Sequence, residues 1–138
     1  MTPKSHATEI KVRYAETDNM GIVYYANYLV WFEVGRTEYL LSQGLDYREV
    51  EKDGLFMAVV EAHCVYKAPA RYGDIVVVDT WPSDVRHSSL KFNYKIYRKK
   101  DKVLLVNGYT THVLIDKELK PRKIPEKIRG FLISSSPC

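Results

Sequence analysis

Cysteine is scarce in this sequence, with two residues in 138. Cys64 lies in an apolar stretch and Cys138 is the last residue, so the pair has neither the spacing of a metal site nor the density of a disulfide framework. The four histidines are equally scattered: His6, His63, His87 and His112. We therefore expect no bound metal and no cofactor, and we interpret Cys64 as a small buried hydrophobic residue rather than a nucleophile.

Long hydrophobic runs are also missing. No stretch reaches the roughly 20 apolar residues that a membrane-spanning helix requires. The opening stretch, MTPKSHATEIKV, has no apolar core of the length found in signal peptides. The sequence therefore predicts a soluble, cytoplasmic protein without a membrane span.

Neither charge dominates the composition. Lysine and arginine together number 21 against 17 aspartate and glutamate residues, which gives a net charge of +4. The one tight basic cluster lies at residues 98–102, and Asp101 interrupts it. A mixed surface of this kind does not indicate a nucleic-acid partner, and an RNA-binding function would rest on charge alone.

Repeats, low-complexity tracts and linker-like segments are absent as well. A chain of 138 residues is long enough to bury one core and too short for two ordinary domains. We therefore predict a single domain, 1–138, with one functional site.

A strand pattern and then a helix pattern occupy the N-terminal third. Apolar residues alternate with charged ones over 8–15, which predicts a strand with one solvent-exposed face. Over 24–41 apolar residues recur at helical spacing. Gly35, in the middle of this predicted helix, indicates close packing against another element, because glycine there costs about 1 kcal/mol relative to alanine.

Four further segments are rich in the residues that favour strands: 55–67, 74–87, 89–98 and 103–115. The short links between them predict that sequential strands are antiparallel neighbours. Pro82 predicts a break in the ladder of its strand, at a bulge or an edge. Alternate residues from Leu90 to Ile96 are apolar, so one side of the sheet is expected to be buried.

The last part of the chain predicts a short C-terminal helix, because Ile124, Ile128 and Leu132 recur at every fourth position. The tail at 134–138 is expected to be loose. Together, these elements predict an α+β fold in which a five-stranded antiparallel sheet wraps around one long central helix.

Asp18 and Gly21 lie in a short polar loop just before the predicted central helix. The free N–H groups and the positive dipole end of the helix start would lie near this carboxylate, an arrangement that suits an anion or a polarised carbonyl oxygen. Asp18 could instead be a turn or capping residue, and Gly21 could serve only the backbone angles of the loop.

Residues 14–28 read YAETDNMGIVYYANY. This stretch resembles the signature of the hotdog-fold acyl-CoA thioesterases, roughly Y-x-x-T-D-x-x-G-[IV]-[VI]-[YF]-[HYF]-x-x-Y, and most of all the branch of 4-hydroxybenzoyl-CoA thioesterase and the YbgC-type enzymes. The resemblance extends over roughly residues 8–118 and includes the KAPARYGD segment at 67–74. It implies that the predicted architecture is the hotdog fold.

The resemblance also implies an acyl-CoA thioester hydrolase. Asp18 is the implied nucleophile or general base, and the backbone N–H of Tyr25 is the implied donor to the thioester carbonyl. Gly21 and Tyr24 lie at positions of the signature that imply substrate binding. YbgC-type enzymes commonly have histidine in place of Tyr25, which favours a role of the backbone over one of the side chain.

The candidates for binding the coenzyme A phosphates are basic residues near strand ends: Arg86, Lys91, Arg98 and Lys99. In the related enzymes two chains pair their sheets edge to edge, and the active site lies between the subunits. The resemblance therefore implies a homodimer as the minimal unit and a dimer of dimers as the usual assembly. A helix too apolar for one sheet to enclose agrees with an obligate dimer.

Other interpretations remain open. A non-catalytic hotdog module could bind an acyl-CoA or acyl carrier protein, but it would not need an acid at the helix start. A hotdog dehydratase would pair an acid with a histidine, and no histidine lies near Asp18 in the sequence. Tyr14 and Tyr28 are interpreted as core aromatics, whereas Glu61 and His63 could face either solvent or the pocket.

Overall fold

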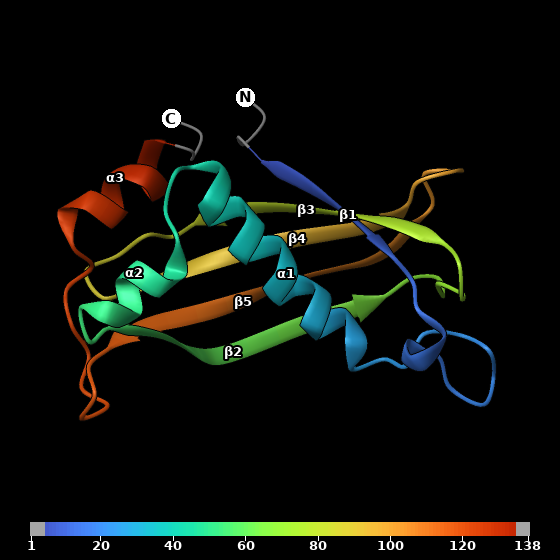
Figure 1. Ribbon diagram of the computed structural model, residues 1–138, viewed down its shortest axis with the longest axis horizontal. Coiled ribbons are helices and arrows are strands. Elements are labelled where there is room, and N and C mark those ends of the chain that lie inside the picture. Colours follow the sequence, from blue (N-terminus) through green and yellow to red (C-terminus); the bar gives the residue numbers. More distant parts are fainter. Residues whose placement is uncertain (1–4, 135–138) are drawn as a thin grey trace.

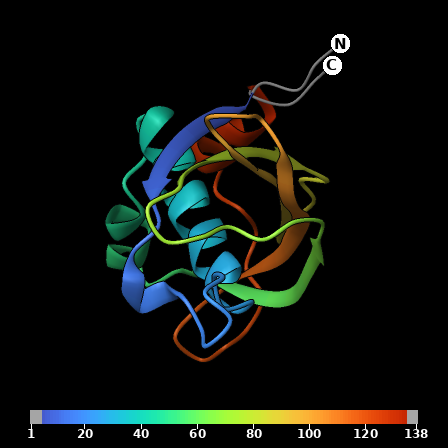
Figure 2. The same ribbon diagram turned by 90° about the vertical axis from the view of Figure 1, so that its right-hand side faces the viewer.

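Five antiparallel strands form a single curved sheet that wraps around the helix α1 (Asn27–Ser42) (Figure 1). The computed structural model describes residues 5–134. The strands are β1 (His6–Lys11), β2 (Phe56–Tyr66), β3 (Ile75–Ser83), β4 (Ser89–Arg98) and β5 (Leu104–Ile115). Their order in the sheet is β1-β3-β4-β5-β2. Seen end-on, the sheet curls around α1, which confirms the predicted hotdog fold (Figure 2).

Three short helical segments complete the chain: the 3-10 helix η1 (Tyr14–Glu16), α2 (Tyr47–Lys52) and α3 (Glu126–Ser134). The segments α2 and α3 lie at the end of the sheet opposite η1 (Figure 1). The predicted C-terminal helix is confirmed, although Ser134 belongs to α3 rather than to a loose tail. Residues 135–138, with Cys138, lie outside the described residues. Within 5–134 no helix is both long and apolar enough to cross a membrane.

The core lies between α1 and the concave face of the sheet. The buried helix residues are Tyr28, Trp31, Phe32, Gly35, Tyr39 and Leu40. On β4 the predicted apolar face is confirmed, because alternate residues from Leu90 to Ile96 are buried. The ring of Phe32 stacks on that of Tyr94 with centroids 4.1 Å apart. Burying these apolar rings stabilises the fold.

Gly35 brings α1 close to β3, as its position in the helix predicted. A Cβ atom at Gly35 would lie 2.5 Å from Thr80 Oγ1 and 2.8 Å from Val78 Cγ1, so alanine there would force these side chains to shift. The helix consequently packs mainly on β1 and β3 and touches β2 only slightly. The packing between α1 and β2 is therefore looser than that between α1 and β1 or β3.

The N-terminal elements begin and end at different residues from those predicted. The first strand ends at Lys11, and residues 14–16 form η1 instead of continuing it. Tyr14 is 75% exposed, so its interpretation as a core aromatic was wrong, whereas Tyr28 is buried as expected. The helix α2 was not predicted, and Asp46 caps it by accepting a hydrogen bond from Arg48 N at 2.9 Å.

The expectation that all sequential strands are neighbours was wrong for β2. It pairs with β5 at the edge of the sheet, whereas β3 lies between β1 and β4. The segment 67–74 crosses the end of the barrel-like curl instead of forming a hairpin, because its backbone bonds to other elements. Lys67 N and Ala68 N donate to Leu105 O at 2.7 and 3.1 Å, and Val23 N donates to Ala70 O at 2.9 Å.

The ladder with β4 continues through Pro82 with no register shift, so no bulge forms there, and the predicted edge is found on the opposite side of β3. Pro82 pairs with Phe92 on β4. The register with β1 ends at Thr80, so the missing N–H of Pro82 falls where β3 has become an edge.

A line of buried polar groups crosses the core beneath α1. Tyr94 Oη lies 2.6 Å from Thr110 Oγ1, which lies 2.7 Å from His112 Nε2. His112 Nδ1 has no hydrogen-bond partner among the described residues. Burial, and to a lesser extent the positive charge of Arg36, lowers the pKa of His112 to about 3.

The free energy of unfolding should decrease as the pH falls below about 6.5. Between the folded pKa of about 3 and the ordinary 6.5, the unfolded chain binds a proton at His112 that the folded chain does not. Stability is therefore lost as pH falls, by about 1.4 kcal/mol per pH unit from this residue, or roughly 2 kcal/mol between pH 6.5 and 5. Urea unfolding of wild type and His112→Gln across this range measures it. Equal slopes in the two proteins would contradict the assignment to His112.

Candidate active site

The loop that carries Asp18 is a tight hairpin between two bridged residues, Thr17 and Val23. Asp18 N donates to Ile22 O at 2.9 Å, and Gly21 N donates to Asp18 O at 3.0 Å. Gly21 has a φ of 79°, which favours glycine, and no atom lies within 4 Å of where its Cβ would be. Its role within the chain is therefore the turn, and the predicted contact with substrate stays a prediction.

The Asp18 carboxylate has one engaged oxygen and one without a hydrogen bond in the described part of the chain. Asp18 Oδ1 accepts from Met20 N at 2.8 Å, which fixes the side chain over the turn. The side chain is half-buried. The turn role considered from the sequence is thus real, and it leaves Asp18 Oδ2 able to accept a proton or attack a carbon atom.

Glu16 fastens this loop to α1, and sequence reasoning missed it. Its buried carboxylate accepts from Arg13 N at 2.8 Å and from Trp31 Nε1 at 2.9 Å. Its backbone oxygen accepts from Tyr24 N at 2.8 Å and Asn27 Nδ2 at 2.9 Å. Every group of Glu16 that can accept a hydrogen bond therefore helps to hold the loop against the helix start.

Glu16→Gln should weaken the fold, because two N–H donors face a carboxylate that accepts at both oxygens. The amide offers one acceptor and one donor, so either Arg13 N–H or Trp31 Nε1–H loses its partner. The expected cost is about 1–3 kcal/mol. Urea unfolding measures it, with Glu118→Gln on the surface as the matched control. An unchanged midpoint in Glu16→Gln would contradict the anchoring role.

The start of α1 has no side-chain cap. Its N-cap residue, Ala26, makes no capping bond, and no acidic residue lies in the first turn. Asn27 N donates to Tyr24 O at 2.9 Å, but the N–H groups of Tyr25 and Ala26 have no acceptor among the described residues. Two donors and the positive end of the helix dipole are therefore available to an oxygen atom from outside.

An aromatic groove of about 350 Å³ runs beside this helix start. Its lining residues are Ile22, Val23, Tyr25, Tyr28, Tyr66, Lys67, Ala68 and Pro69. Tyr66 Oη donates to Tyr25 O at 3.0 Å, and Tyr28 Oη accepts from Ala70 N at 3.1 Å. Asp18 does not line the groove itself, but Ile22 and Val23 of its loop do. Tyr66 was not among the predicted site residues.

The pKa values of four groups near the groove, those of Tyr24, Tyr28, Cys64 and Tyr66, are raised. Burial and the hydrogen bond with Cys64 raise the pKa of Tyr66 to about 12. Burial also raises the pKa of Tyr28 and of the half-buried Cys64. The hydrogen bond and charge of Tyr25 raise the pKa of Tyr24. These groups can donate hydrogen bonds, but they are poor bases, and the Cys64 thiol is not activated.

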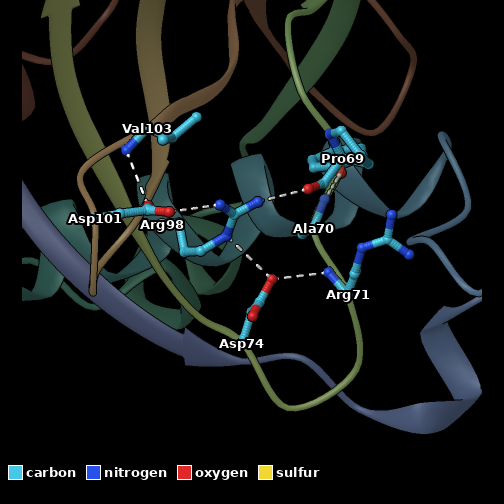
Figure 3. A network of polar contacts seen from close by, with 8 residues as sticks. Pro69, Ala70, Arg71, Asp74, Arg98, Asp101 and Val103 are labelled. Carbon is cyan, nitrogen blue, oxygen red and sulfur yellow. Dashed lines mark hydrogen bonds and ion pairs between the residues drawn. The ribbon is translucent and has the colours of Figure 1, made fainter.

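Arg98 holds the crossing segment 67–74 in place (Figure 3). Its guanidinium forms ion pairs with Asp74 at 3.3 Å and Asp101 at 2.8 Å, and it donates to Pro69 O at 2.9 Å. Lys99 Nζ pairs with Glu9 at 2.7 Å. Both were predicted phosphate ligands, and Arg98 has a structural role that leaves little of it accessible.

Arg86 and Lys91, the other predicted phosphate ligands, lie far from Asp18 within the chain. Lys91 is near the start of β4, about 23 Å along the strand from Arg98 beside the site. Lys91 pairs with Asp84 at 3.6 Å and lies 4.4 Å from the centre of the Tyr109 ring. These residues could reach a bound coenzyme A only from a second subunit, so their role stays a prediction.

None of the four histidines contacts Asp18, which weakens the dehydratase alternative. His112 is buried beneath α1, and His63 stacks on Tyr109 with ring centroids 5.0 Å apart. His87 lies at the opposite end of the molecule, where its carbonyl accepts from Ile124 N at 2.8 Å. His6 pairs with Thr80 at the far end of β1. An acid and histidine pair is therefore not formed at this loop.

Comparisons with known proteins agree with this geometry. The model of the thioesterase-like superfamily matches residues 12–132. YneP of Bacillus subtilis, a candidate acyl-CoA thioesterase, is 46% identical over 110 residues, which cover 80% of this chain and 79% of YneP. The acyl-CoA thioester hydrolase YbgC of Escherichia coli O6:H1 is 30% identical over 120 residues, covering 86% of this chain and 89% of YbgC.

Solved structures give the same result. The DHNA-CoA thioesterase of Staphylococcus aureus superposes with a TM-score of 0.86 at 30% identity, covering 97% of each chain. The hypothetical protein TT1821 of Thermus thermophilus gives 0.89 at 38% identity, covering 97% of this chain and 99% of that one. Fold, loop motif and relatives all lead to one assignment, and the chain belongs to the thioesterase-like superfamily of hotdog-fold proteins.

Proposed function

We propose that this protein is an acyl-CoA thioesterase, which hydrolyses an acyl-CoA to the free acid and coenzyme A. The observation that carries the proposal is the free oxygen of Asp18 on a hairpin that leads directly into an uncapped helix start. One carboxylate and one oxyanion donor suffice for a thioester, because a thiol leaves readily without a separate acid. The named activities of YneP and YbgC support the same reaction.

The reaction can proceed through Asp18 in two ways. As a general base, Asp18 takes a proton from water while the water oxygen bonds to the carbonyl carbon. As a nucleophile, Asp18 bonds to that carbon, coenzyme A leaves, and water then hydrolyses the mixed anhydride. In both, the N–H of Tyr25 stabilises the negative charge formed on the carbonyl oxygen, the bond from carbon to sulfur breaks, and coenzyme A leaves as a thiolate that takes up the proton released from water. Gly21 and Tyr24 remain proposed substrate-binding residues, although neither is among the lining residues of the aromatic groove.

The test is release of free thiol from a panel of butyryl-, decanoyl-, palmitoyl- and benzoyl-CoA. Turnover of any member well above the rate without enzyme supports a hydrolase. Binding of acyl-CoA without turnover would instead favour a non-catalytic hotdog module that holds an acyl-CoA or an acyl carrier protein. A cytoplasmic location remains a prediction from the sequence.

We also propose that two copies pair through β2. This strand spans Phe56–Tyr66, borders only β5 among the described residues, and exposes Val59 and Val60 at 48% and 60%. A long apolar edge with unpaired backbone groups is stabilised by a second strand. Leu29 and Val30 add exposed apolar surface on α1. A homodimer is thus the proposed minimal unit, and a dimer of dimers is the assembly that the family resemblance implies.

Val60→Lys should shift the protein from dimer to monomer, because a charge on the edge opposes strand pairing. Sedimentation equilibrium at micromolar concentration measures the mass. Val103→Lys, at an exposed hairpin tip outside β2, is the matched control and should keep the wild-type mass. A monomeric wild type, or a Val60→Lys protein with the wild-type mass, would refute pairing through β2.

A further inference from the structure

The hairpin that carries Asp18 is held on both of its sides. On the side before Asp18, Glu16 binds the loop to α1 through its carboxylate and its backbone oxygen. On the side after Asp18, Val23 N donates to Ala70 O at 2.9 Å. Ala70 belongs to the crossing segment 67–74. The position of Asp18 therefore depends on a segment that is distant from it in the sequence.

Ala70 also contacts the start of α1. Ala70 N donates to Tyr28 Oη at 3.1 Å, and Tyr28 lies in the first turn of the helix. Ala70 is fully buried, so its backbone groups have no water as an alternative partner. One residue thus joins the hairpin to the helix start, the two elements that carry the carboxylate of Asp18 and the N–H of Tyr25. A displacement of Ala70 would move these two elements relative to one another.

The guanidinium of Arg98 fixes the residues on both sides of Ala70 (Figure 3). It donates directly to Pro69 O at 2.9 Å. It also donates to Asp74 Oδ2 at 3.3 Å, and the same oxygen accepts from Arg71 N at 2.9 Å. Pro69 is therefore held by Arg98 directly, and Arg71 is held through Asp74.

The guanidinium itself has little freedom to move. Its Nη1 donates to Asp101 Oδ2 at 2.8 Å, and the side chains of Arg98 and Asp74 are each 17% exposed. The three acceptors, Pro69 O and the two carboxylates, are each bound by a different nitrogen of the planar fork. A lysine ammonium carries the same charge but lacks the fork, so it cannot reproduce all three bonds. The shape of the side chain, and not only its charge, holds the segment.

We propose that Arg98 is a positioning residue of the reaction, which acts through Ala70 to set the distance between the Asp18 carboxylate and the N–H of Tyr25. The proposal rests on the proposed thioesterase function and deepens it. Both groups must meet one thioester, the carboxylate or its water at the carbonyl carbon and the N–H at the oxygen. A misplacement of about 1 Å can lower the rate by about 100-fold. Arg98 therefore affects the rate without contacting the substrate.

A positioning role of Arg98 has a different kinetic effect from that of a phosphate ligand, the role predicted from the sequence. A residue that binds coenzyme A equally in the ground state and the transition state changes KM and leaves kcat unchanged. A positioning residue changes kcat and leaves KM nearly unchanged. A residue that only stabilises the fold changes neither constant as long as the protein stays folded.

The test measures kcat and KM of Arg98→Met and Arg98→Lys with the best acyl-CoA of the panel. Both variants should lose at least about tenfold in kcat, with KM within about twofold of wild type, because both lack the fork. Lysine keeps the charge, so a phosphate ligand would instead give a raised KM in Arg98→Met and nearly wild-type constants in Arg98→Lys. That pattern, or wild-type kcat in both folded variants, would overturn the proposal.

Two control variants separate positioning from general loosening of the fold. Arg122 pairs with Asp116 at 2.7 Å, but it follows β5 at the other end of that strand, so Arg122→Met should keep wild-type kcat. Tyr94→Phe removes the buried contact with Thr110 Oγ1 and should lower stability while it leaves kcat unchanged. If Tyr94→Phe lowered kcat as much as Arg98→Met, loosening of the fold would explain the effect and the proposal would be refuted.

Amide hydrogen exchange measures the same link without substrate. In Arg98→Lys the N–H of Val23 should exchange at least about tenfold faster than in wild type, because its acceptor on Ala70 is held less firmly. Arg122→Met should leave this rate unchanged. Wild-type exchange of Val23 in Arg98→Lys would show that Arg98 does not order the hairpin and would overturn the proposal.

A further variant replaces Arg98→Met if that protein fails to fold. Asp74→Asn removes the ion pair with Arg98 and should lower kcat at least about threefold with KM unchanged. Wild-type kcat in Asp74→Asn would then overturn the proposal. A wild type that hydrolyses no thioester refutes the proposed function itself, and exchange at Val23 then decides whether Arg98 orders the hairpin. Turnover by wild type with unaltered kcat in the variants refutes only the positioning role.

Discussion

Asp18→Asn should lower thioester hydrolysis by at least about 100-fold, a loss that is usual when a general base is removed. The amide has the same shape and can still accept the bond from Met20 N, so the hairpin should keep its form. It cannot take a proton from water and is a poor nucleophile. Thiol release from the best acyl-CoA of the panel measures the change in kcat.

Asp53→Asn provides the matched control for this experiment, because Asp53 is an exposed residue after α2 and away from the hairpin. It should retain wild-type activity. Circular dichroism and thermal unfolding must agree between the two variants before their rates are compared. An Asp18→Asn protein that is folded and as active as wild type would exclude Asp18 from the chemistry.

Gly108→Ala should be the most destabilising single methyl addition in the chain. Gly108 lies on β5 opposite Cys64, and a Cβ there would overlap the backbone carbonyl oxygen of His63. It would also lie 3.1 Å from Phe32 Cε2. Since a backbone atom of a paired strand cannot rotate away, the expected loss is about 3 kcal/mol or more.

Alanine variants at two other glycines serve as comparisons for this prediction. At Gly35 the clash is with the side chains of Thr80 and Val78, which can shift, and alanine gains helix propensity. Gly130, within α3, has nothing within 4 Å, so Gly130→Ala should be neutral or stabilise by up to about 1 kcal/mol. Urea unfolding should rank the variants Gly130, Gly35, Gly108 in order of increasing damage. A Gly108→Ala protein as stable as Gly130→Ala would show that β2 and β5 are not held as described.

The fold was predictable where a pattern is local. The bounds of the strand 89–98 were predicted correctly to the residue. Its apolar and polar side chains alternate, and only one orientation of the strand buries the apolar ones. The order of strands was not predictable in the same way. A segment such as 67–74 can form a hairpin or cross to another strand, and the choice depends on backbone bonds to Leu105 and Val23, which no local pattern displays.

The same difference between local and distant information applies to the site residues. Asp18 and Tyr25 were proposed from the sequence because one contiguous motif carries both. Glu16 and Tyr66 were not, because each acquires its role from a partner distant in sequence: Trp31 and the Tyr25 carbonyl, respectively. From the sequence alone, Arg13 and Glu16 look like an ordinary surface ion pair. Only the structure shows that Glu16 is buried and accepts a hydrogen bond from Trp31 Nε1.

The position of β2 has a consequence for how substrate and assembly affect each other. The strand contributes Tyr66 to the aromatic groove and is also an edge of the sheet. A ligand that orders this strand reduces the entropy cost of pairing with a second copy. Pairing that orders the strand likewise reduces the entropy cost of ligand binding. Thermodynamic linkage makes the two effects equal in free energy. Apparent substrate affinity should therefore depend on protein concentration, and a dilute enzyme should assemble as its substrate is added.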